Sequence, residues 1–211
     1  MTDPDSDPAG QEDESAADSD VESAAAAISA GGLVVYPTET VYGLAADATD
    51  PDAVDHVFTA KGRPRDEPLS VAFADVDAAL AATEANDRAE RFMRAFLPGP
   101  VTVVVGRGSD LPDAITGGRQ RVGVRVPDHP TARALARAAG PVTATSANRS
   151  GAGSVRRVSR LDADVRERVD VVLDGGEVPG GESTVVDPER GVIHRAGLRS
   201  DAVREWLASE P

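Results

Sequence analysis

The chain has 211 residues, with 36 acidic against 22 basic side chains, a formal net charge of -14, 3% aromatic residues and no cysteine. This length is typical of a single domain, and the lack of cysteine excludes disulfides, thiolate catalysis and zinc–thiolate sites. No stretch is apolar enough to span a bilayer and no signal-peptide pattern opens the chain, so we expect a cytoplasmic protein without a membrane partner.

The acidic side chains are concentrated at the start of the chain. Residues 1–23 carry nine carboxylates and no basic residue, which leaves 27 acidic against 22 basic residues, a net charge of -5, for the rest. We therefore predict a disordered acidic tail over residues 1–20 and one folded domain over residues 21–211. Lys61 is the only lysine beside 21 arginines. This composition favours adaptation to high salt over the alternative of a mesophilic protein with an acidic tail.

Helices and strands are predicted to alternate along the chain. An alanine-rich helix is expected over residues 16–30, then a buried strand at 33–36, then a helix from the Asp50-Pro51 start signal to residue 60. Further strands are expected at residues 69–73, 101–105, 122–126, 142–145, 171–173, 184–186 and 192–194. Further helices are expected at residues 87–96, 131–139, 161–169 and 201–208. This pattern predicts one α/β domain with a twisted, mixed sheet flanked by helices.

Several familiar motifs are missing from the sequence. It has no phosphate-binding P-loop, no dinucleotide-binding glycine pattern and no nucleophile elbow. Its three histidines lack the spacing of metal ligands, so no protein metal site is predicted. A nucleotide would have to be held by other groups, and covalent nucleophilic catalysis is not indicated.

Two polar clusters lie in the first third of the chain. Thr38 and Thr40 are two positions apart, so that in an extended segment their hydroxyls face one side, although threonine is also an ordinary strand residue. Lys61 and Arg63 follow a predicted helix and could hold a triphosphate or only complement the helix dipole. That Lys61 is the one lysine of the chain favours a functional role.

The remaining polar clusters follow later strands. Ser146 and Asn148 could bind a ligand at a strand end or form an ordinary turn. Ser183 and Arg195 form another weak cluster, and Arg121 and Arg125, on or beside one strand, are candidates for anion contacts.

Taken together, six motifs resemble the YrdC-like family, the threonylcarbamoyl-AMP synthases. In chain order they are YPTETVYGL (36–44), KGRPRDEPL (61–69), PGPVT (98–102), VRVPDHP (124–130), TSANRSG (145–151) and STVVD (183–187). The resemblance covers nearly the whole predicted domain. It implies the YrdC-like fold in its single-domain form.

The resemblance also implies a reaction. In this family L-threonine, bicarbonate and ATP, with Mg²⁺ on the triphosphate, give L-threonylcarbamoyl-AMP and pyrophosphate. The product serves the modification of an adenosine beside the anticodon of tRNA, reached directly or through a separate transferase complex. No protein ligand for Mg²⁺ is identified.

The matching positions imply roles for eleven residues, with Lys61 and Arg63 as the catalytic pair. The implied contacts to ATP come from Lys61, Arg63, Arg121, Ser146, Asn148, Ser154 and Arg195. The implied contacts to threonine come from Thr38, Thr40, Arg125 and Ser183. Ala72 stands where many members carry histidine, which leaves one substrate contact of the family open.

Two other functions remain open at this point. One is a non-catalytic RNA-binding module of the same fold, against which the retention of Lys61, Arg63, Ser146 and Asn148 argues. The other is an enzyme that forms a carbamoyl-adenylate, for which we would expect accompanying zinc-finger and acylphosphatase-like modules.

Overall fold

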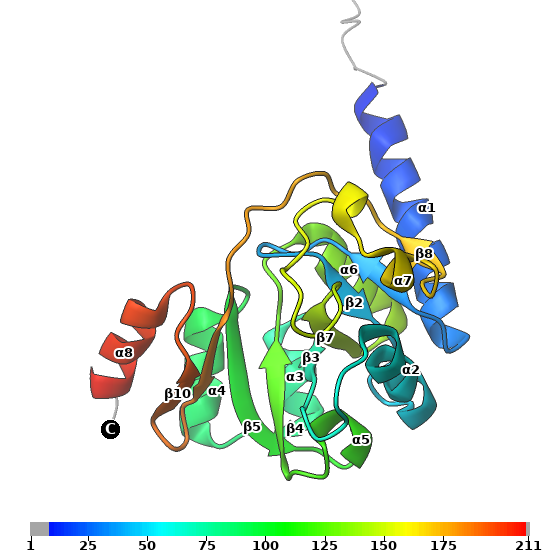
Figure 1. The fold of residues 1–211 in the computed structure, drawn as a ribbon. Helices are drawn as coiled ribbons and strands as arrows, with labels where there is room; N and C mark the ends of the chain where they lie inside the picture. Colours follow the sequence, from blue (N-terminus) through cyan, green and yellow to red (C-terminus); the bar gives the residue numbers. More distant parts are fainter. Residues whose placement is uncertain (1–8, 210–211) are drawn as a thin grey trace, which may run out of the picture.

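The computed structural model describes the backbone of residues 9–209 and the side chains from Asp18 onward. Over this range the chain forms one mixed sheet with helices packed on it, which confirms the predicted fold class (Figure 1). The ten described strands follow the order β10-β9-β5-β6-β3-β7-β2-β1-β8, and β4 pairs with β5 outside this path. The pairs β1–β8, β3–β6 and β5–β9 are parallel, and the other pairs are antiparallel.

The strands are mostly short. They are β1 (Val34–Tyr36), β2 (Gly43–Ala45), β3 (Ser70–Ala72), β4 (Thr83–Glu84), β5 (Val101–Arg107), β6 (Arg121–Arg125), β7 (Val142–Ser146), β8 (Val171–Val172), β9 (Thr184–Asp187) and β10 (Val192–Arg195). The helices are α1 (Ala9–Ser29), α2 (Pro51–Lys61), α3 (Val76–Ala81), α4 (Asp87–Phe96), α5 (Asp113–Thr116), α6 (Pro130–Ala139), α7 (Ala163–Arg166) and α8 (Ser200–Ser209), with a 3₁₀ turn, η1 (Val158–Arg160). No helix in this part of the chain has the length and hydropathy needed to cross a bilayer.

The first helix begins earlier than the predicted start at residue 16. α1 begins at Ala9, so the described part of the segment predicted as disordered is helical, and residues 1–8 lie outside the described residues. Residues 9–15 carry the carboxylates Glu12, Asp13 and Glu14, and negative charge near a helix N-terminus complements the helix dipole, which favours a start before residue 16. It ends as predicted, with Gly31 at φ 83° and the Gly32 N–H bonded to the Ala27 carbonyl.

Local capping signals place the helix that carries Lys61. The Asp50 side chain accepts a hydrogen bond from the Asp52 N–H at 2.9 Å, Pro51 occupies the first turn, and Gly62 closes the helix in the left-handed region at φ 58°. Lys61 is thereby fixed in the last turn of α2.

Several short elements differ from the predictions. The helix expected at 161–169 is replaced by η1 and the four-residue α7. β2, α3, β4 and α5 were not predicted. Segments of two to six residues carry too few positions for a periodic pattern, and pairing with neighbouring strands is what makes β2 and β4 extended.

Side-chain alternation divides the buried residues between two clusters. On β1, Val35 belongs to the larger cluster, whereas Val34 and Tyr36 belong to the smaller one beneath α1 and α6. α2, α3 and α4 contribute to the larger cluster. The smaller cluster also includes Ala45, Ala72 and Val142, so it extends across the sheet from β8 to β3 but has no member on β5 or β6. This face of β5 and β6 is therefore left uncovered by that cluster.

Candidate functional site

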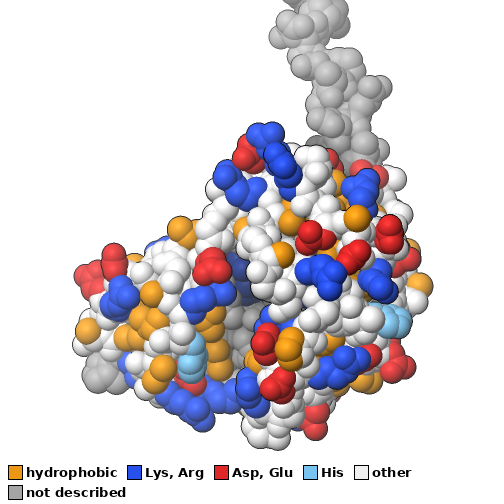
Figure 2. All heavy atoms as spheres, in the orientation of Figure 1, with side chains coloured by type: hydrophobic (Ala, Val, Ile, Leu, Met, Phe, Trp, Pro, Cys, Tyr) orange, Lys and Arg blue, Asp and Glu red, His pale blue; other side chains and the backbone are white. Residues whose placement is uncertain are grey.

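A cavity of about 700 Å³ lies over this free part of the sheet. Its floor follows from strand alternation: on β6, Val122 and Val124 are buried in the larger cluster, whereas Arg121, Gly123 and Arg125 line the cavity. β5 alternates in the same way. Figure 2 shows the cavity as a hollow between the part of the molecule that carries α8 and β10 and the remainder, with basic side chains beside it.

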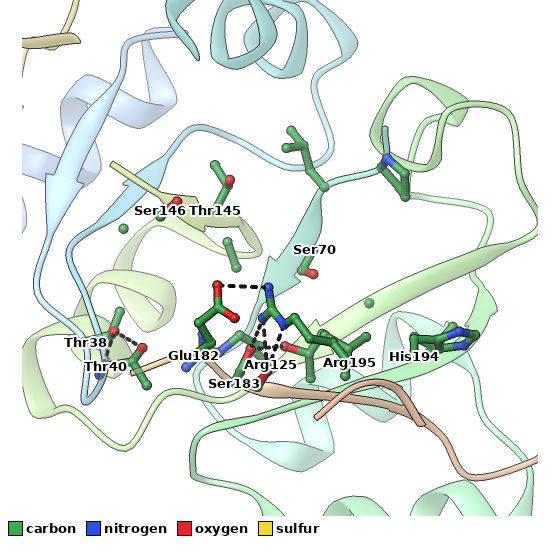
Figure 3. Close-up of a pocket in the computed structure, with 18 of the residues that line it drawn as sticks. Thr38, Thr40, Ser70, Arg125, Thr145, Ser146, Glu182, Ser183, His194 and Arg195 are labelled. Atoms are coloured by element: carbon green, nitrogen blue, oxygen red, sulfur yellow. Dashed lines mark hydrogen bonds and ion pairs between the residues drawn. The ribbon is translucent and has the colours of Figure 1, made fainter. Parts of the chain in front are cut away.

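Nine of the eleven predicted site residues line this one cavity. They are Thr38, Thr40, Arg63, Arg121, Arg125, Ser146, Ser154, Ser183 and Arg195. Among those labelled in Figure 3, Thr38 and Thr40 come from the loop after β1, Ser146 from the end of β7, and Ser183 and Arg195 from the β9–β10 region, so segments far apart in sequence meet near Arg125. Lys61 and Asn148 are not among the lining residues.

The floor of the cavity requires a glycine. A Cβ atom at Gly123 would lie 2.6 Å from Ser70 Oγ and 3.0 Å from Thr102 Cγ2. Both hydroxyl-bearing residues line the cavity beside it. A side chain at position 123 would displace these hydroxyls and fill the space above β6.

The loop after β1 presents its two threonines together, through a turn and not through the extended segment on which the prediction rested. The hydroxyl oxygens of Thr38 and Thr40 are 3.0 Å apart, and both residues are buried. Thr38 Oγ1 also donates to the Val41 carbonyl at 2.7 Å and accepts from the Thr40 and Val41 N–H groups. The segment is therefore a side-chain-stabilised turn that holds both hydroxyls at the cavity wall.

Arg125, at the end of β6, forms an ion pair with Glu39 of the same loop. Arg125 Nη2 donates to Glu39 Oε1 at 2.5 Å, and each side chain is only 13% exposed. Arg125 Nε and Glu39 Oε2 have no hydrogen-bond partner among the described residues. The guanidinium thus retains unfilled donors.

Ser183 and Arg195, predicted in different subsites, are in direct contact. Arg195 donates from Nε and Nη2 to the Ser183 carbonyl and from Nη2 to Ser183 Oγ at 3.0 Å. Ser183 Oγ lies 3.0 Å from Thr102 Oγ1. β5, β9 and β10 are thereby joined through side chains at the cavity wall.

Arg121 also lines the cavity, but carboxylates already hold its guanidinium. It pairs with Asp187 at 2.8 Å and with Glu189 at 2.6 Å, and it donates to the Val104 carbonyl at 2.8 Å. The Asp187 side chain is 1% exposed. A buried carboxylate requires a cationic partner, so the role of Arg121 in the fold is to neutralise Asp187.

Arg63 is less constrained. It donates to the Glu67 and Pro68 carbonyls at 3.1 Å and pairs with the Glu67 carboxylate at 3.3 Å, where Glu67 is half exposed. An exposed pair of this kind contributes little to stability and is readily exchanged for another anion.

Lys61 and Asn148 meet behind the cavity wall. Lys61 is 2% exposed, and its ammonium donates to the Ser146 carbonyl and, at 2.6 Å, to the Asn148 carbonyl. The Asn148 amide donates to the Arg149 and Ala152 carbonyls. Burial, followed by the neighbouring charge of Arg63, lowers the pKa of Lys61 to about 8, against the opposing effect of Asp162. Both side chains therefore hold the loop that presents Ser146 to the cavity.

Sequence reasoning missed several residues of the site. Ser70, Thr102, Thr145 and His194 line the cavity, and Glu39 holds Arg125. Thr102 and Glu39 lie inside the quoted motifs, so alternation along β5 and the charge between two threonines were available as signals. No pattern in the sequence indicated Ser70 or His194 as site residues.

Two further expectations concern Ala72 and metal binding. Ala72 is fully buried in the smaller cluster and does not line the cavity. Among the side chains that the structure describes, residues 18–209, no group of three or more histidine, aspartate or glutamate side chains gathers as a metal site requires.

Comparison with known proteins places the chain among relatives of similar sequence and fold. Residues 26–197 match the Sua5/YciO/YrdC family, described as Telomere recombination. A threonylcarbamoyl-AMP synthase from Pyrococcus abyssi is 42% identical over 167 residues, covering 78% of this chain and 49% of that protein. A threonylcarbamoyl-AMP synthase from Bacillus subtilis is 40% identical over 173 residues, covering 80% of this chain and 50% of that protein.

A solved structure agrees with these similarities. The crystal structure of P. abyssi Sua5 complexed with L-threonine has a TM-score of 0.74 at 40% identity, covering 81% of this chain and 51% of that one. The chain spans about half the length of these relatives. With the family match extending over most of the described residues, the chain belongs to the Sua5/YciO/YrdC family.

Proposed function

We propose that the protein makes L-threonylcarbamoyl-AMP and pyrophosphate from L-threonine, bicarbonate and ATP. The observation that carries this proposal is the convergence of Arg63, Arg125 and Arg195 with several hydroxyl groups on one cavity. Cations and hydroxyls of this kind suit an amino acid carboxylate and a triphosphate. Relatives at about 40% identity carry the corresponding name, and one of their structures contains L-threonine.

The reaction needs no nucleophile from the protein. The threonine amine adds to carbon dioxide derived from bicarbonate and releases a proton, which gives a carbamate. A carbamate oxygen then attacks the α-phosphorus of ATP, and the bond to the bridging oxygen breaks as pyrophosphate leaves. What remains for the protein is to align the two substrates and to stabilise the charge that develops on the phosphates.

The threonine end of the cavity is assigned to Thr38, Thr40, Arg125 and Ser183. In this proposal Arg125, which lines the cavity and donates one hydrogen bond, to Glu39, receives the substrate carboxylate, and the hydroxyls receive the remaining polar groups. The cluster is compact, because the loop after β1 reaches Arg125 through Glu39.

The nucleotide end is assigned to Arg63, Ser146, Ser154 and Arg195, all of which line the cavity. Arg63 exchanges its exposed Glu67 partner for phosphate oxygens. Mg²⁺ enters as part of the ATP substrate and shares the neutralisation of the triphosphate.

Three residues from the sequence-based set receive revised roles. Lys61 and Asn148 act by holding the loop that carries Ser146, and Arg121 acts by compensating Asp187 and Glu189. We infer further that the product is consumed in the modification of tRNA, directly or through a separate transferase complex. We infer that the reaction takes place in the cytoplasm.

Pyrophosphate release from ATP tests the proposal when it is measured with and without L-threonine and bicarbonate. Release that requires both supports it. RNA binding without turnover would instead favour the non-catalytic module, and turnover of carbamoyl phosphate would favour a carbamoyl-adenylate-forming enzyme. Omitting threonine alone and bicarbonate alone provides the matched controls.

A further inference from the structure

The ion pair between Glu39 and Arg125 has an asymmetric arrangement. Glu39 lies in the chain between Thr38 and Thr40, both of which line the cavity, yet Glu39 is not a lining residue. Its Oε1 atom accepts from Nη2 of Arg125 at 2.5 Å. The carboxylate therefore reaches the guanidinium from the loop and leaves the cavity side of Arg125 free.

The pairing also uses little of the hydrogen-bonding capacity of either group. A guanidinium has five N–H donors and can bind a carboxylate through two parallel hydrogen bonds. Here one such bond is made, and Arg125 Nε and Glu39 Oε2 remain buried without a partner in the described structure. An arginine held in this way is oriented but not saturated.

The other titratable groups that face Glu39 do not replace Arg125 as its partner. Burial raises the pKa of Tyr36 to about 12, so the phenol is neutral at physiological pH. Burial lowers the pKa of His129 despite the opposing charges of Glu39 and Asp128, so the imidazole is neutral near pH 7. The charge of Glu39 is therefore compensated by Arg125.

We propose that Glu39 is a positioning residue that fixes Arg125 in the orientation that receives the carboxylate of L-threonine. This inference rests on the proposed function. Without Glu39, the arginine side chain would lose the contact that selects one of its rotamers, and part of the binding free energy of threonine would go into ordering it. Because Glu39 belongs to the same turn as Thr38 and Thr40, it also ties the position of Arg125 to that of the two hydroxyls.

Calorimetric titration with L-threonine tests this role without requiring turnover. Glu39→Ala is expected to weaken threonine binding by at least about tenfold, the effect of losing one hydrogen bond to a charged group. Glu39→Gln retains an acceptor oxygen at the same distance and is expected to remain within about threefold of wild type. The affinity for a non-hydrolysable ATP analogue should stay within about twofold in both variants, because a positioning role at the threonine end does not extend to the nucleotide.

The matched control is Glu90→Gln, which removes the charge of an exposed glutamate paired with Arg94 on α4. Glu39→Asp replaces Glu39→Ala if the alanine variant unfolds, because it retains the charge but is one methylene too short. It should then weaken threonine binding by at least about threefold.

The outcomes separate this inference from the function on which it rests. Failure of wild-type protein to bind L-threonine would overturn both. Wild-type binding with unchanged affinity in Glu39→Ala, or in Glu39→Asp if the alanine variant unfolds, would overturn the role of Glu39 alone. Equal loss of threonine and nucleotide binding would also overturn it, since that pattern indicates a general structural defect.

Discussion

Replacement of Lys61 by alanine should reduce the activity strongly and the free energy of unfolding only modestly. The ammonium is buried and donates to the Ser146 and Asn148 carbonyls, so it supports the loop from which Ser146 faces the cavity. We expect the rate of threonine-dependent pyrophosphate release to fall by about two orders of magnitude, the size of effect that follows when substrate-positioning groups are displaced by about 1 Å.

The stability change should be modest because two contributions oppose each other. A pKa lowered from 10.5 to about 8 means that the fold disfavours the charged form by roughly 3 kcal/mol. Two hydrogen bonds from a charged donor contribute roughly 1.5–3 kcal/mol each. Lys61→Ala removes both contributions, so the free energy of unfolding should decrease by less than about 3 kcal/mol.

Raising the pH above 8 should change stability and activity in opposite directions. Between pH 8 and 10.5 the unfolded lysine still binds a proton that the folded one has lost, so the Lys61 contribution to the free energy of unfolding rises with pH. Activity should fall over the lower part of this range, because the neutral amine holds the loop less strongly. Well below pH 8 the lysine is protonated in both the folded and the unfolded state, so its contribution to the free energy of unfolding no longer changes with pH.

The assay combines urea unfolding with pyrophosphate release across this pH range for wild type and Lys61→Ala. Lys61→Met serves as a control that retains apolar volume without the charge. An alanine variant with near-normal pyrophosphate release would refute the reasoning, as would a wild-type activity that is unchanged as pH rises through 8.

Three further predictions address neighbouring contacts. Arg121→Gln should destabilise the protein by about 3–5 kcal/mol in chemical denaturation, because Asp187 is left buried without its closest cation, and a stable but inactive variant would contradict this role. Ser183→Ala should raise the KM for L-threonine by about tenfold, since it removes a hydroxyl assigned to the threonine end, and should change the KM for ATP little, because Arg195 keeps its hydrogen bonds to the Ser183 carbonyl; unchanged kinetics would exclude the assignment. The Tm should rise between low salt and molar KCl because of the net charge of -14, and a Tm indifferent to salt would argue against salt adaptation.

Much of the fold was predictable where the signal was local. α4 begins and ends at the predicted residues because Asn86 caps it and its apolar face has helical spacing. The alternation of β6 likewise separates its arginines from its valines. The extra length of α1 escaped prediction because it arises from composition without apolar periodicity.

The residues that gather at the cavity were predictable in part, but their contacts with one another were not. The motifs identified nine residues that meet at one cavity. They did not indicate that Arg121 is paired with Glu189, 68 positions away, or that Lys61 points toward backbone carbonyls. Such contacts depend on long-range packing, which sequence spacing does not encode.

The central claim is most directly tested by the identity of the product. Incubation of the protein with MgATP, L-threonine and isotopically labelled bicarbonate, followed by mass spectrometry, should yield L-threonylcarbamoyl-AMP that carries the label together with an equal amount of pyrophosphate. Pyrophosphate formed without a labelled adenylate, or an adenylate formed in the absence of threonine, would contradict the account.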